Sequence, residues 1–253
     1  RLNPESIIEM NPITQEIVWE WHAMDHIIQD EDPSKSNYGS VADNPNKIDI
    51  NYNYRTRDNG DIMHINGLTL DEENDLLYLT VNNYSEVWVL DHSTTTEEAK
   101  TNSGGNYGLG GDLVYRFGNP ETYDNIGDAT LSNVHYPNLL ETGNMLVYAN
   151  SVYGNQSEVV EYDLNPPYSL VAGQNNEPDV VWTFTDNDLY SSGISSAVRM
   201  DNGNTLITEG REGTLWEVTD AGEIEWLYKT NYFTIWRTYV FYKDDPAISA
   251  LGL

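Results

Sequence analysis

Cysteine is absent from this sequence of 253 residues. Its absence excludes a disulfide framework, a zinc site with thiolate ligands and a cysteine nucleophile. The sequence also lacks any run of about 18 apolar residues, so we expect no insertion into a membrane. Residue 1 is Arg rather than Met and no signal-peptide pattern follows it. We therefore expect an N-terminus that was processed or truncated.

Positive charge is scarce. The sequence has 12 Lys and Arg against 41 Asp and Glu, which gives a formal net charge of −29. A protein with this charge repels nucleic acid, so nucleic acid is not an expected partner. Hydrophobic residues make up 39% of the chain and aromatic residues 11%. This composition indicates a folded protein with an acidic surface rather than a disordered acidic tail.

One composite pattern recurs along the chain: a short apolar strand that ends in an acidic turn, then a second strand built around Trp or Tyr. Its copies lie at 6–21, 85–118, 157–185 and 213–228. A hairpin with an Asp, Asn or Gly turn precedes each later copy, at 68–81, 139–150 and 198–210. Two hairpins in succession predict a four-stranded antiparallel meander, and successive meanders predict an all-β β-propeller.

We expect one partial propeller domain over residues 1–253. Its expected parts are the outer half of a blade at 6–21, whole blades near 64–118, 135–185 and 192–229, and a final strand from 236. A β-sandwich also has short alternating strands, but four copies of one composite motif favour the propeller. The half-blade lacks inner strands, so we expect upstream residues or another polypeptide to complete the ring.

Six long segments in order carry a resemblance to a known family. They include DIMHINGLTLD (61–71), GGDLVYRFGNPETY (110–123) and YSSGISSAVRMDNGNTLITEG (190–210), with the others at 16–39, 85–99 and 236–253. Over essentially its whole length the chain resembles the arylsulfotransferase-like family of secreted bacterial β-propellers. The resemblance implies six blades in the full-length protein, with the N-terminal blades missing here, and a secreted or cell-surface location. It also implies transfer of a sulfuryl group between phenols through a sulfated histidine, without a nucleotide donor.

Three residues occupy equivalent positions at the start of inner strands. His135 lies nine residues before Asn144 of a Gly-Asn turn, and Ser195 lies nine before Asn204 of the next one. His64 opens the corresponding strand of the preceding blade. Innermost strands of a propeller line its central channel, so we expect His64, His135 and Ser195 to converge there.

The resemblance also assigns His64 and Asn66 to a His-x-Asn motif of the family. A histidine suits a nucleophile or general base because its pKa lies near neutrality. Sulfuryl transfer also needs donors for the charge on the non-bridging oxygens, and Arg199 and Arg237 are the expected donors. We therefore predict His64, His135, Arg199 and Arg237 as catalytic, with Asn66 and Ser195 binding substrate. The alternative is that His64 and His135 are structural and form hydrogen bonds between inner strands.

Two departures from the family pattern keep a second function open. No His follows His135, although the enzymes place their sulfated histidine in a later blade, and the segment Asn150–Asn155 lacks the family's Arg. The first hypothesis is a transferase whose partners are a phenolic sulfate and a phenol. The second is a non-catalytic secreted or cell-surface propeller that acts as a binding or scaffold module.

His22 and His26 form a second cluster, with Asp25 between them. On a helix the two imidazoles would share one face, but no Glu follows His22 as a zincin site requires. The resemblance gives this segment a structural or cavity-rim role; for the cavity rim, His22 and His26 are predicted to bind substrate, and no metal ligand is named. Acidic stretches at 30–32, 71–75 and 186–188 suit calcium in composition, yet none has the spacing of an EF-hand loop. No cofactor and no calcium ligand set are predicted.

Overall fold

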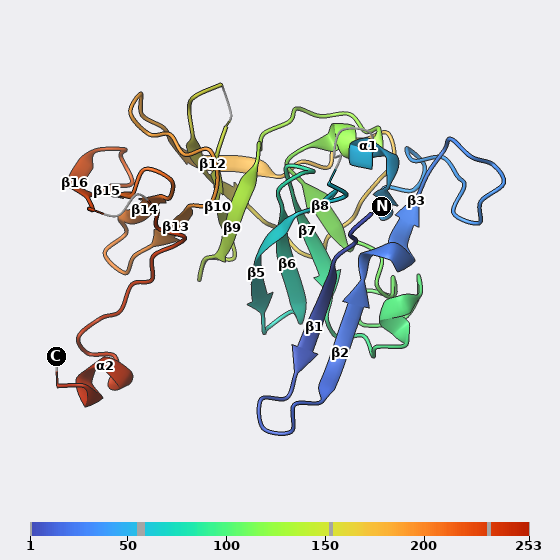
Figure 1. The fold of residues 1–253 in the computed structure, drawn as a ribbon, viewed down its shortest axis with the longest axis horizontal. Helices are drawn as coiled ribbons and strands as arrows, with labels where there is room; N and C mark the ends of the chain where they lie inside the picture. The colour runs from blue at the N-terminus through green and yellow to red at the C-terminus, as the bar shows by residue number, and fades with distance from the viewer. Residues whose placement is uncertain (1, 55–58, 152–153, 232–233, 253) are drawn as a thin grey trace.

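A computed structural model describes residues 2–54, 59–151, 154–231 and 234–252. Three four-stranded antiparallel sheets dominate it, each a meander in chain order (Figure 1). Their strands are β5 (Ile65–Asp71), β6 (Leu76–Val81), β7 (Glu86–Asp91) and β8 (Tyr115–Phe117); β9 (Val134–Leu139), β10 (Met145–Ala149), β11 (Glu158–Asp163) and β12 (Asp179–Phe184); and β13 (Ser196–Arg199), β14 (Thr205–Glu209), β15 (Thr214–Val218) and β16 (Ile224–Lys229). The predicted all-β fold with four-stranded blades is confirmed.

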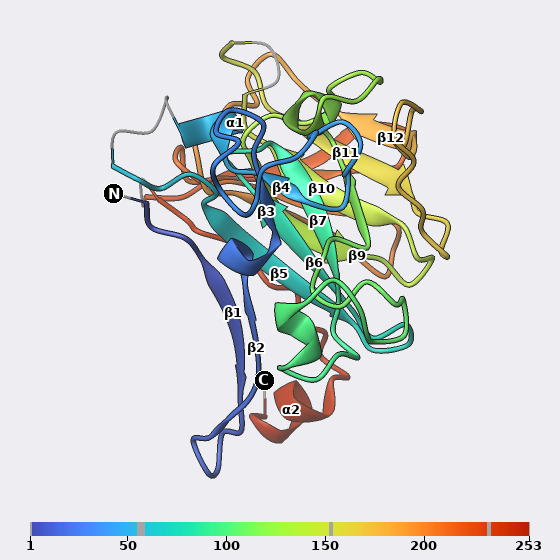
Figure 2. The same cartoon turned by 90° about the vertical axis from the view of Figure 1, so that its right-hand side faces the viewer.

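The remaining elements are short. A hairpin pairs β1 (Ser6–Met10) with β2 (Ile17–His22) and projects beyond the sheet β5–β8 (Figure 2). Other elements are the 3₁₀ helices η1 (Ala23–His26), η2 (Glu98–Lys100) and η3 (Pro120–Tyr123), the parallel pair β3 (Ile27–Ile28) and β4 (Ile48–Asp49), and the helices α1 (Asn51–Tyr54) and α2 (Pro246–Ala250). None of the helices in the described parts of the chain has the length and apolar character needed to span a bilayer.

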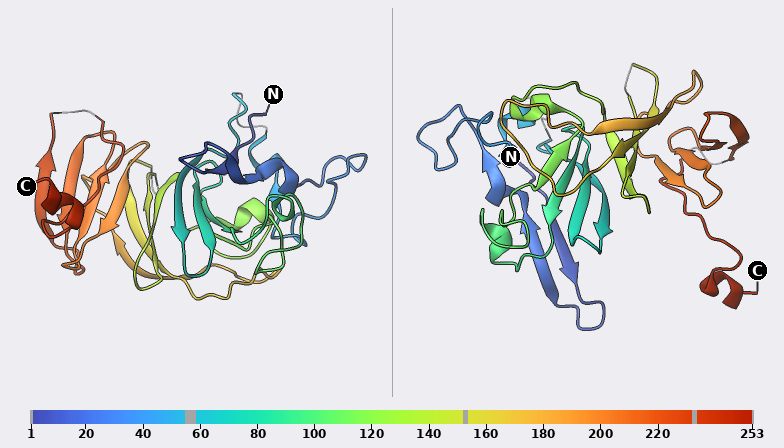
Figure 3. Two further views of the ribbon diagram at one scale, coloured as in Figure 1. Left: turned by 90° about the horizontal axis from the view of Figure 1, so that it is seen from below. Right: turned by 180° about the vertical axis from the view of Figure 1, so that it is seen from behind.

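The sheets pack face to face in chain order (Figure 3). Between the hairpin and the sheet β5–β8 the core contains Trp19, Trp21 and Trp88. A second core, with Tyr78, Phe117, Val147 and Tyr162, joins the sheets β5–β8 and β9–β12. A third, with Tyr148, Ile207 and Trp216, joins β9–β12 to β13–β16. Both faces of a middle blade are therefore buried, which explains why β6 and β7 are buried at every position.

The first strand of each sheet is its innermost strand, and β9 packs against both β5 and β13. The approach of β5 to β9 is close at Gly67, where an added Cβ would lie 2.5 Å from Pro137 Cδ and from Thr80 Oγ1. Asn66 joins the same two strands, because its Nδ2 donates to the Val134 carbonyl while its Oδ1 accepts from Thr80. These contacts fix the ends of the inner strands relative to one another.

The strand expected from residue 236 does not form. Trp236 to Tyr242 runs past the start of β13 without a ladder. Ile235 N–H donates to the Gly210 carbonyl, and the Trp236 carbonyl accepts from Ser195 N–H at 3.3 Å. Further on, Thr238 meets β14 through a hydroxyl contact with Thr208. The β-branched and aromatic residues of this segment suit a strand, but a strand also requires a run of paired backbone groups, which this segment lacks.

The acidic stretches at 30–32, 71–75 and 186–188, whose composition suits calcium, form tight turns. The carboxylate of Asp71 accepts from the backbone N–H groups of Glu73 and Asn74, and Asp186 accepts from Asp188 N–H. Asp32 accepts from the backbone and hydroxyl of Ser34. Side chains that bond to a backbone two or three residues ahead are typical of tight turns. Within the described residues no group of three or more His, Asp or Glu could hold a metal ion.

Candidate anion-binding pocket

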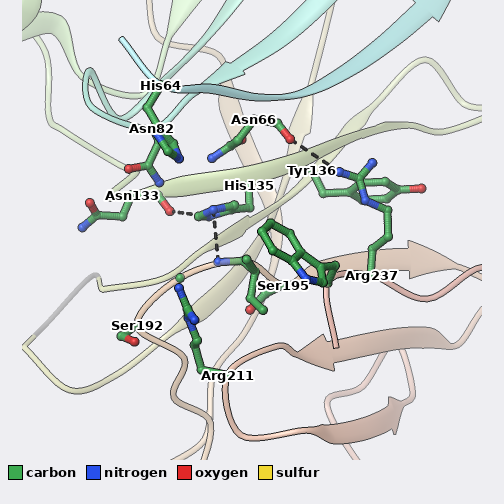
Figure 4. Close-up of a pocket in the computed structure, with 13 residues that line it drawn as sticks. His64, Asn66, Asn82, Asn133, His135, Tyr136, Ser192, Ser195, Arg211 and Arg237 are labelled. Atoms are coloured by element: carbon green, nitrogen blue, oxygen red, sulfur yellow. Dashed lines mark hydrogen bonds between the residues drawn. The ribbon is translucent and has the colours of Figure 1, made fainter. Parts of the chain in front are cut away.

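A cavity of 420 Å³ lies where the innermost strands begin. His64 directly precedes β5, His135 is the second residue of β9, and Ser195 directly precedes β13. The lining residues are His64, Asn66, Asn82, Asn133, His135, Tyr136, Ser192, Gly193, Ile194, Ser195, Arg211, Trp236 and Arg237 (Figure 4). The set contains two arginines and no Asp or Glu. In a chain of net charge −29 this lining is locally positive.

His64 presents one imidazole nitrogen to the pocket. Its Nδ1 lies 2.7 Å from Asp61 Oδ2, and about half of the side chain is exposed. A carboxylate only accepts hydrogen bonds, so Nδ1 bears a proton; in the neutral tautomer with this proton, the lone pair is on Nε2. Nε2 has no hydrogen-bond partner in the described parts of the chain. The pair resembles the acid–base dyads in which a carboxylate orients a histidine.

The backbone beside His64 is held by a half-buried carboxylate. His64 has a positive φ of 57°, a conformation that is uncommon for residues other than glycine. Both carboxylate oxygens of Glu5 accept from the next backbone N–H, that of Ile65, at 3.0 and 2.9 Å. Burial raises the pKa of Glu5, although this hydrogen bond opposes the shift. Glu5 thereby anchors the start of β5 and the direction of the imidazole.

His135 is a neutral, fully hydrogen-bonded residue. Its Nε2 accepts from Ile194 N–H at 3.1 Å, so its Nδ1 is the protonated nitrogen. Nδ1 donates toward the Asn133 carbonyl and toward Asn150 Oδ1. The amide of Asn150 in turn donates to the carbonyls of Ser191 and Ile194. Burial lowers the pKa of His135 to about 4, so the ring is uncharged at neutral pH. His135 therefore lines the wall of the cavity and does not act as a base.

Arg211 and Arg237 supply the positive charge. Neither guanidinium forms an ion pair with a carboxylate in the described parts of the chain. Arg237 lies over the ring of Tyr136, 5.2 Å from its centroid, and its Nη2 reaches the Asn66 carbonyl at 3.5 Å. Arg211 is exposed and follows β14 by two residues. Guanidinium groups that are free of an ion pair at a cavity can donate charge-assisted hydrogen bonds to an anion.

Arg199 does not lie in this pocket. Its Nη2 pairs with Glu161 at 2.6 Å, and the guanidinium lies 4.9 Å from the ring centroid of Trp182. It is the last residue of β13, four positions beyond Ser195. A strand rises about 3.3 Å per residue, so Arg199 lies near the opposite end of the blade. Arg199 was predicted as a catalytic donor, but it forms a structural ion pair with Glu161 instead.

His22 and His26 also lie elsewhere. His26 is fully buried, with Nδ1 2.7 Å from Asp112, Nε2 2.8 Å from the Ala99 carbonyl and its ring stacked on Trp21. His22 is the last residue of β2, and its Nδ1 contacts the hydroxyl of Ser6 at 2.7 Å. The two residues do not share a helical face, because His22 belongs to a strand and residues 23–26 form a 3₁₀ turn. Neither lines the cavity.

The structure brings together His64, Asn66, His135, Ser195 and Arg237 from the predicted set. The side-chain amide of Asn66 ties β5 to β9 through its hydrogen bonds to Val134 and Thr80. Ser195 Oγ accepts from Gly210 N–H at 3.0 Å, which fixes the loop that leads to Arg211.

Sequence reasoning missed Asp61 and Arg211. One signal was available for Arg211: the β14–β15 turn lies at the same end of its blade as Ser195.

Comparisons with known proteins leave the family of this chain open. No family model matches it, and no curated protein does. Among solved structures, a protein of unknown function from Bacteroides caccae is similar with a TM-score of 0.46 and 12% identity, over 88% of this chain and 54% of that one. Virginiamycin B lyase from Staphylococcus aureus has a TM-score of 0.35 and 14% identity, over 69% of this chain and 43% of that one. BamB from Moraxella catarrhalis has a TM-score of 0.35 and 13% identity, over 69% and 37%. The chain spans about half the length of the first of these proteins.

Proposed function

We propose that this propeller binds a sulfated phenol in the pocket beside His64 and transfers its sulfuryl group to a second phenol. The observation that carries the proposal is the lining itself, which combines an oriented histidine, two unpaired arginines and no carboxylate. The resemblance of the sequence to arylsulfotransferase-like propellers supports the same chemistry. Sulfate monoesters keep a negative charge throughout the transfer, so a positive pocket in an acidic protein suits them.

His64 is the nucleophile in this proposal. Nε2 attacks sulfur, a nitrogen–sulfur bond forms, and the bond from sulfur to the donor oxygen breaks with its electron pair on the departing phenolate. The acceptor phenol then attacks sulfur, the nitrogen–sulfur electron pair returns to Nε2, and the acceptor's proton passes to the phenolate. The net reaction exchanges an aryl sulfate and a phenol for a new aryl sulfate and a new phenol. The atoms and charges of this reaction balance without a metal or a nucleotide.

The neighbouring residues have distinct roles. Asp61 holds Nδ1–H and stabilises the positive charge that the ring acquires when Nε2 is sulfated. Arg211 approaches the side of the pocket that holds His64 and Asn133 (Figure 4) and donates to the non-bridging sulfuryl oxygens. His135 forms the neutral wall between the arginines, since both of its nitrogens are already bonded.

A non-catalytic binding module is the second candidate. The observation that favours it is the complete hydrogen bonding of His135, which leaves His64 as the sole imidazole with a free nitrogen among the described pocket residues. A single histidine can bind an anion without transferring it. In that case the same pocket would hold an aryl sulfate, and the propeller would act through binding.

The deciding experiment is a transfer assay. Purified protein is incubated with 4-nitrophenyl sulfate and phenol, and 4-nitrophenolate and phenyl sulfate are measured together. Turnover that His64→Ala abolishes, while His22→Ala preserves it, supports the transferase. His22→Ala is the matched control because it removes an imidazole outside the cavity. Binding of 4-nitrophenyl sulfate without phenyl sulfate formation would overturn the transferase and leave the binding module.

A further inference from the structure

The two arginines of the pocket do not converge on one point. In Figure 4, Arg211 and Arg237 approach from opposite sides of the His135 ring. Arg237 is held on its side by the face of Tyr136 and by the Asn66 carbonyl. Arg211 comes from the turn after β14 and lies beside Gly193 and Ser192. A small anion such as sulfate could accept from one guanidinium but would leave the other without a partner.

The pocket between the arginines is uncharged. His135 is neutral at physiological pH because burial lowers its pKa to about 4. Ile194 and Ser195 complete this part of the lining, and the Ser195 Oγ accepts a hydrogen bond from Gly210 N–H. A ligand with charge at its centre would find no counter-charge there, whereas an apolar or aromatic body would not have to displace one.

Aromatic side chains border the same cavity. Trp236 lines it although 70% of the residue is exposed, and Tyr136 lines it beneath Arg237. Exposed Trp and Tyr beside a cavity favour a planar ligand, because they offer apolar area at a low entropic cost of ordering. The cavity volume of 420 Å³ is large enough for a substituted benzene ring.

We infer that the preferred ligand of this pocket is an aromatic dianion, with a sulfuryl-type group at the Arg211 end and a carboxylate at the Arg237 end. The inference rests on the proposed function for the placement of the sulfuryl group beside His64. It adds a substrate class: aryl sulfates whose ring bears a second acidic group. Arg237 is then a specificity residue that contacts the far end of the ligand rather than the reacting sulfur.

Binding of unreactive sulfonates tests this class without requiring transfer. Isothermal titration of the protein with 4-sulfobenzoate, benzenesulfonate and benzoate compares one dianion with its two halves. We expect 4-sulfobenzoate to bind at least about tenfold more tightly than either monoanion, the gain typical of one further charge-assisted hydrogen-bonded contact. Equal affinity for 4-sulfobenzoate and benzenesulfonate would overturn the inference, and so would the absence of saturable binding by all three at 10 mM (about the weakest affinity titration detects).

Three variants test which arginine binds which acidic group of the ligand. Arg237→Gln should reduce the affinity for 4-sulfobenzoate to within about twofold of that for benzenesulfonate, and the affinity for benzenesulfonate should not change. Arg211→Gln should weaken both sulfonates by about tenfold. Lys35→Gln removes one exposed cation outside the pocket and should leave the affinities for both sulfonates unchanged. If Arg237→Gln weakens benzenesulfonate as much as 4-sulfobenzoate, both arginines serve one anion and the inference is wrong. A dianion preference in a protein without transfer activity would keep this inference and remove the transferase.

Discussion

Glu177 is predicted to make the packing between two blades depend on pH. It lies just before β12, and its Oε2 accepts from the backbone N–H of Gly118, which follows β8, at 2.6 Å. Its Oε1 is buried without a partner among the described residues. Burial is the main cause that raises the pKa of Glu177 from 4.5 to about 8, and nearby Glu86 adds to the shift. The folded protein therefore favours the protonated carboxyl.

The sign of the effect follows from linkage. Because the folded pKa lies above the unfolded pKa, the stabilisation is complete below about pH 4.5 and is lost as the pH rises through about 8. A shift between these two pKa values corresponds to a loss of at most about 4–5 kcal/mol in the free energy of unfolding above pH 9. Gln is a neutral isostere of the protonated side chain and keeps an acceptor for Gly118 N–H, so Glu177→Gln should avoid most of this loss.

Urea denaturation followed by tryptophan fluorescence at pH 5, 7 and 9 measures the difference between Glu177→Gln and the parent protein. At pH 5 the two should agree within about 1 kcal/mol, and at pH 9 the variant should be more stable by about 2–4 kcal/mol. Glu72→Gln, in the exposed β5–β6 turn, is the matched control for removal of one negative charge. A stability difference that does not change between pH 5 and pH 9 would refute the reasoning about Glu177.

Three further predictions concern the core, the inner strands and the dyad. Glu86→Gln leaves the fully buried guanidinium of Arg116 without its counter-charge and should lower the free energy of unfolding by about 3–5 kcal/mol in urea denaturation. Gly67→Ala places a Cβ 2.5 Å from atoms of a neighbouring strand and should cost about 1–3 kcal/mol, seen as a lower Tm, whereas Gly193→Ala, with nothing nearer than 3.8 Å, should not. Asp61→Asn should slow sulfuryl transfer on the order of 10²–10⁴-fold while benzenesulfonate affinity changes less than about threefold; equal losses in both would contradict its role in orienting the imidazole.

The blades were predictable because each strand and each turn has a local signal. Alternation of apolar and polar residues, Trp and Tyr in outer strands and Asp, Asn or Gly at turns are properties of neighbouring residues in the chain. The segment from Trp236 is also rich in aromatic and β-branched residues, yet it forms no strand. Its outcome depends on contacts with Ser195 and Gly210, which are distant in sequence. A local sequence pattern does not show whether a neighbouring strand lies in register to pair with the segment.

The candidate site was predictable where it follows from strand order. The nine-residue spacing before each Gly-Asn turn placed His135 and Ser195 at the start of inner strands, and both line the cavity. Arg199 was misplaced because proximity in sequence to Ser195 is not proximity in space along an extended strand. Asp61 lies in a loop without periodicity, and its hydrogen bond to the imidazole depends on a backbone of positive φ at His64 that no residue pattern indicated.

The central claim is that an anion binds between His64 and Arg211. A crystal structure of the protein soaked with 4-nitrophenyl sulfate tests it most directly. We predict the sulfuryl group in the cavity, with sulfur about 3–3.5 Å from Nε2 of His64 as a near-attack geometry requires, and a non-bridging oxygen that accepts a hydrogen bond from the Arg211 guanidinium. An aryl sulfate bound elsewhere on the protein, or a cavity that stays empty at a concentration that saturates binding in solution, would contradict it.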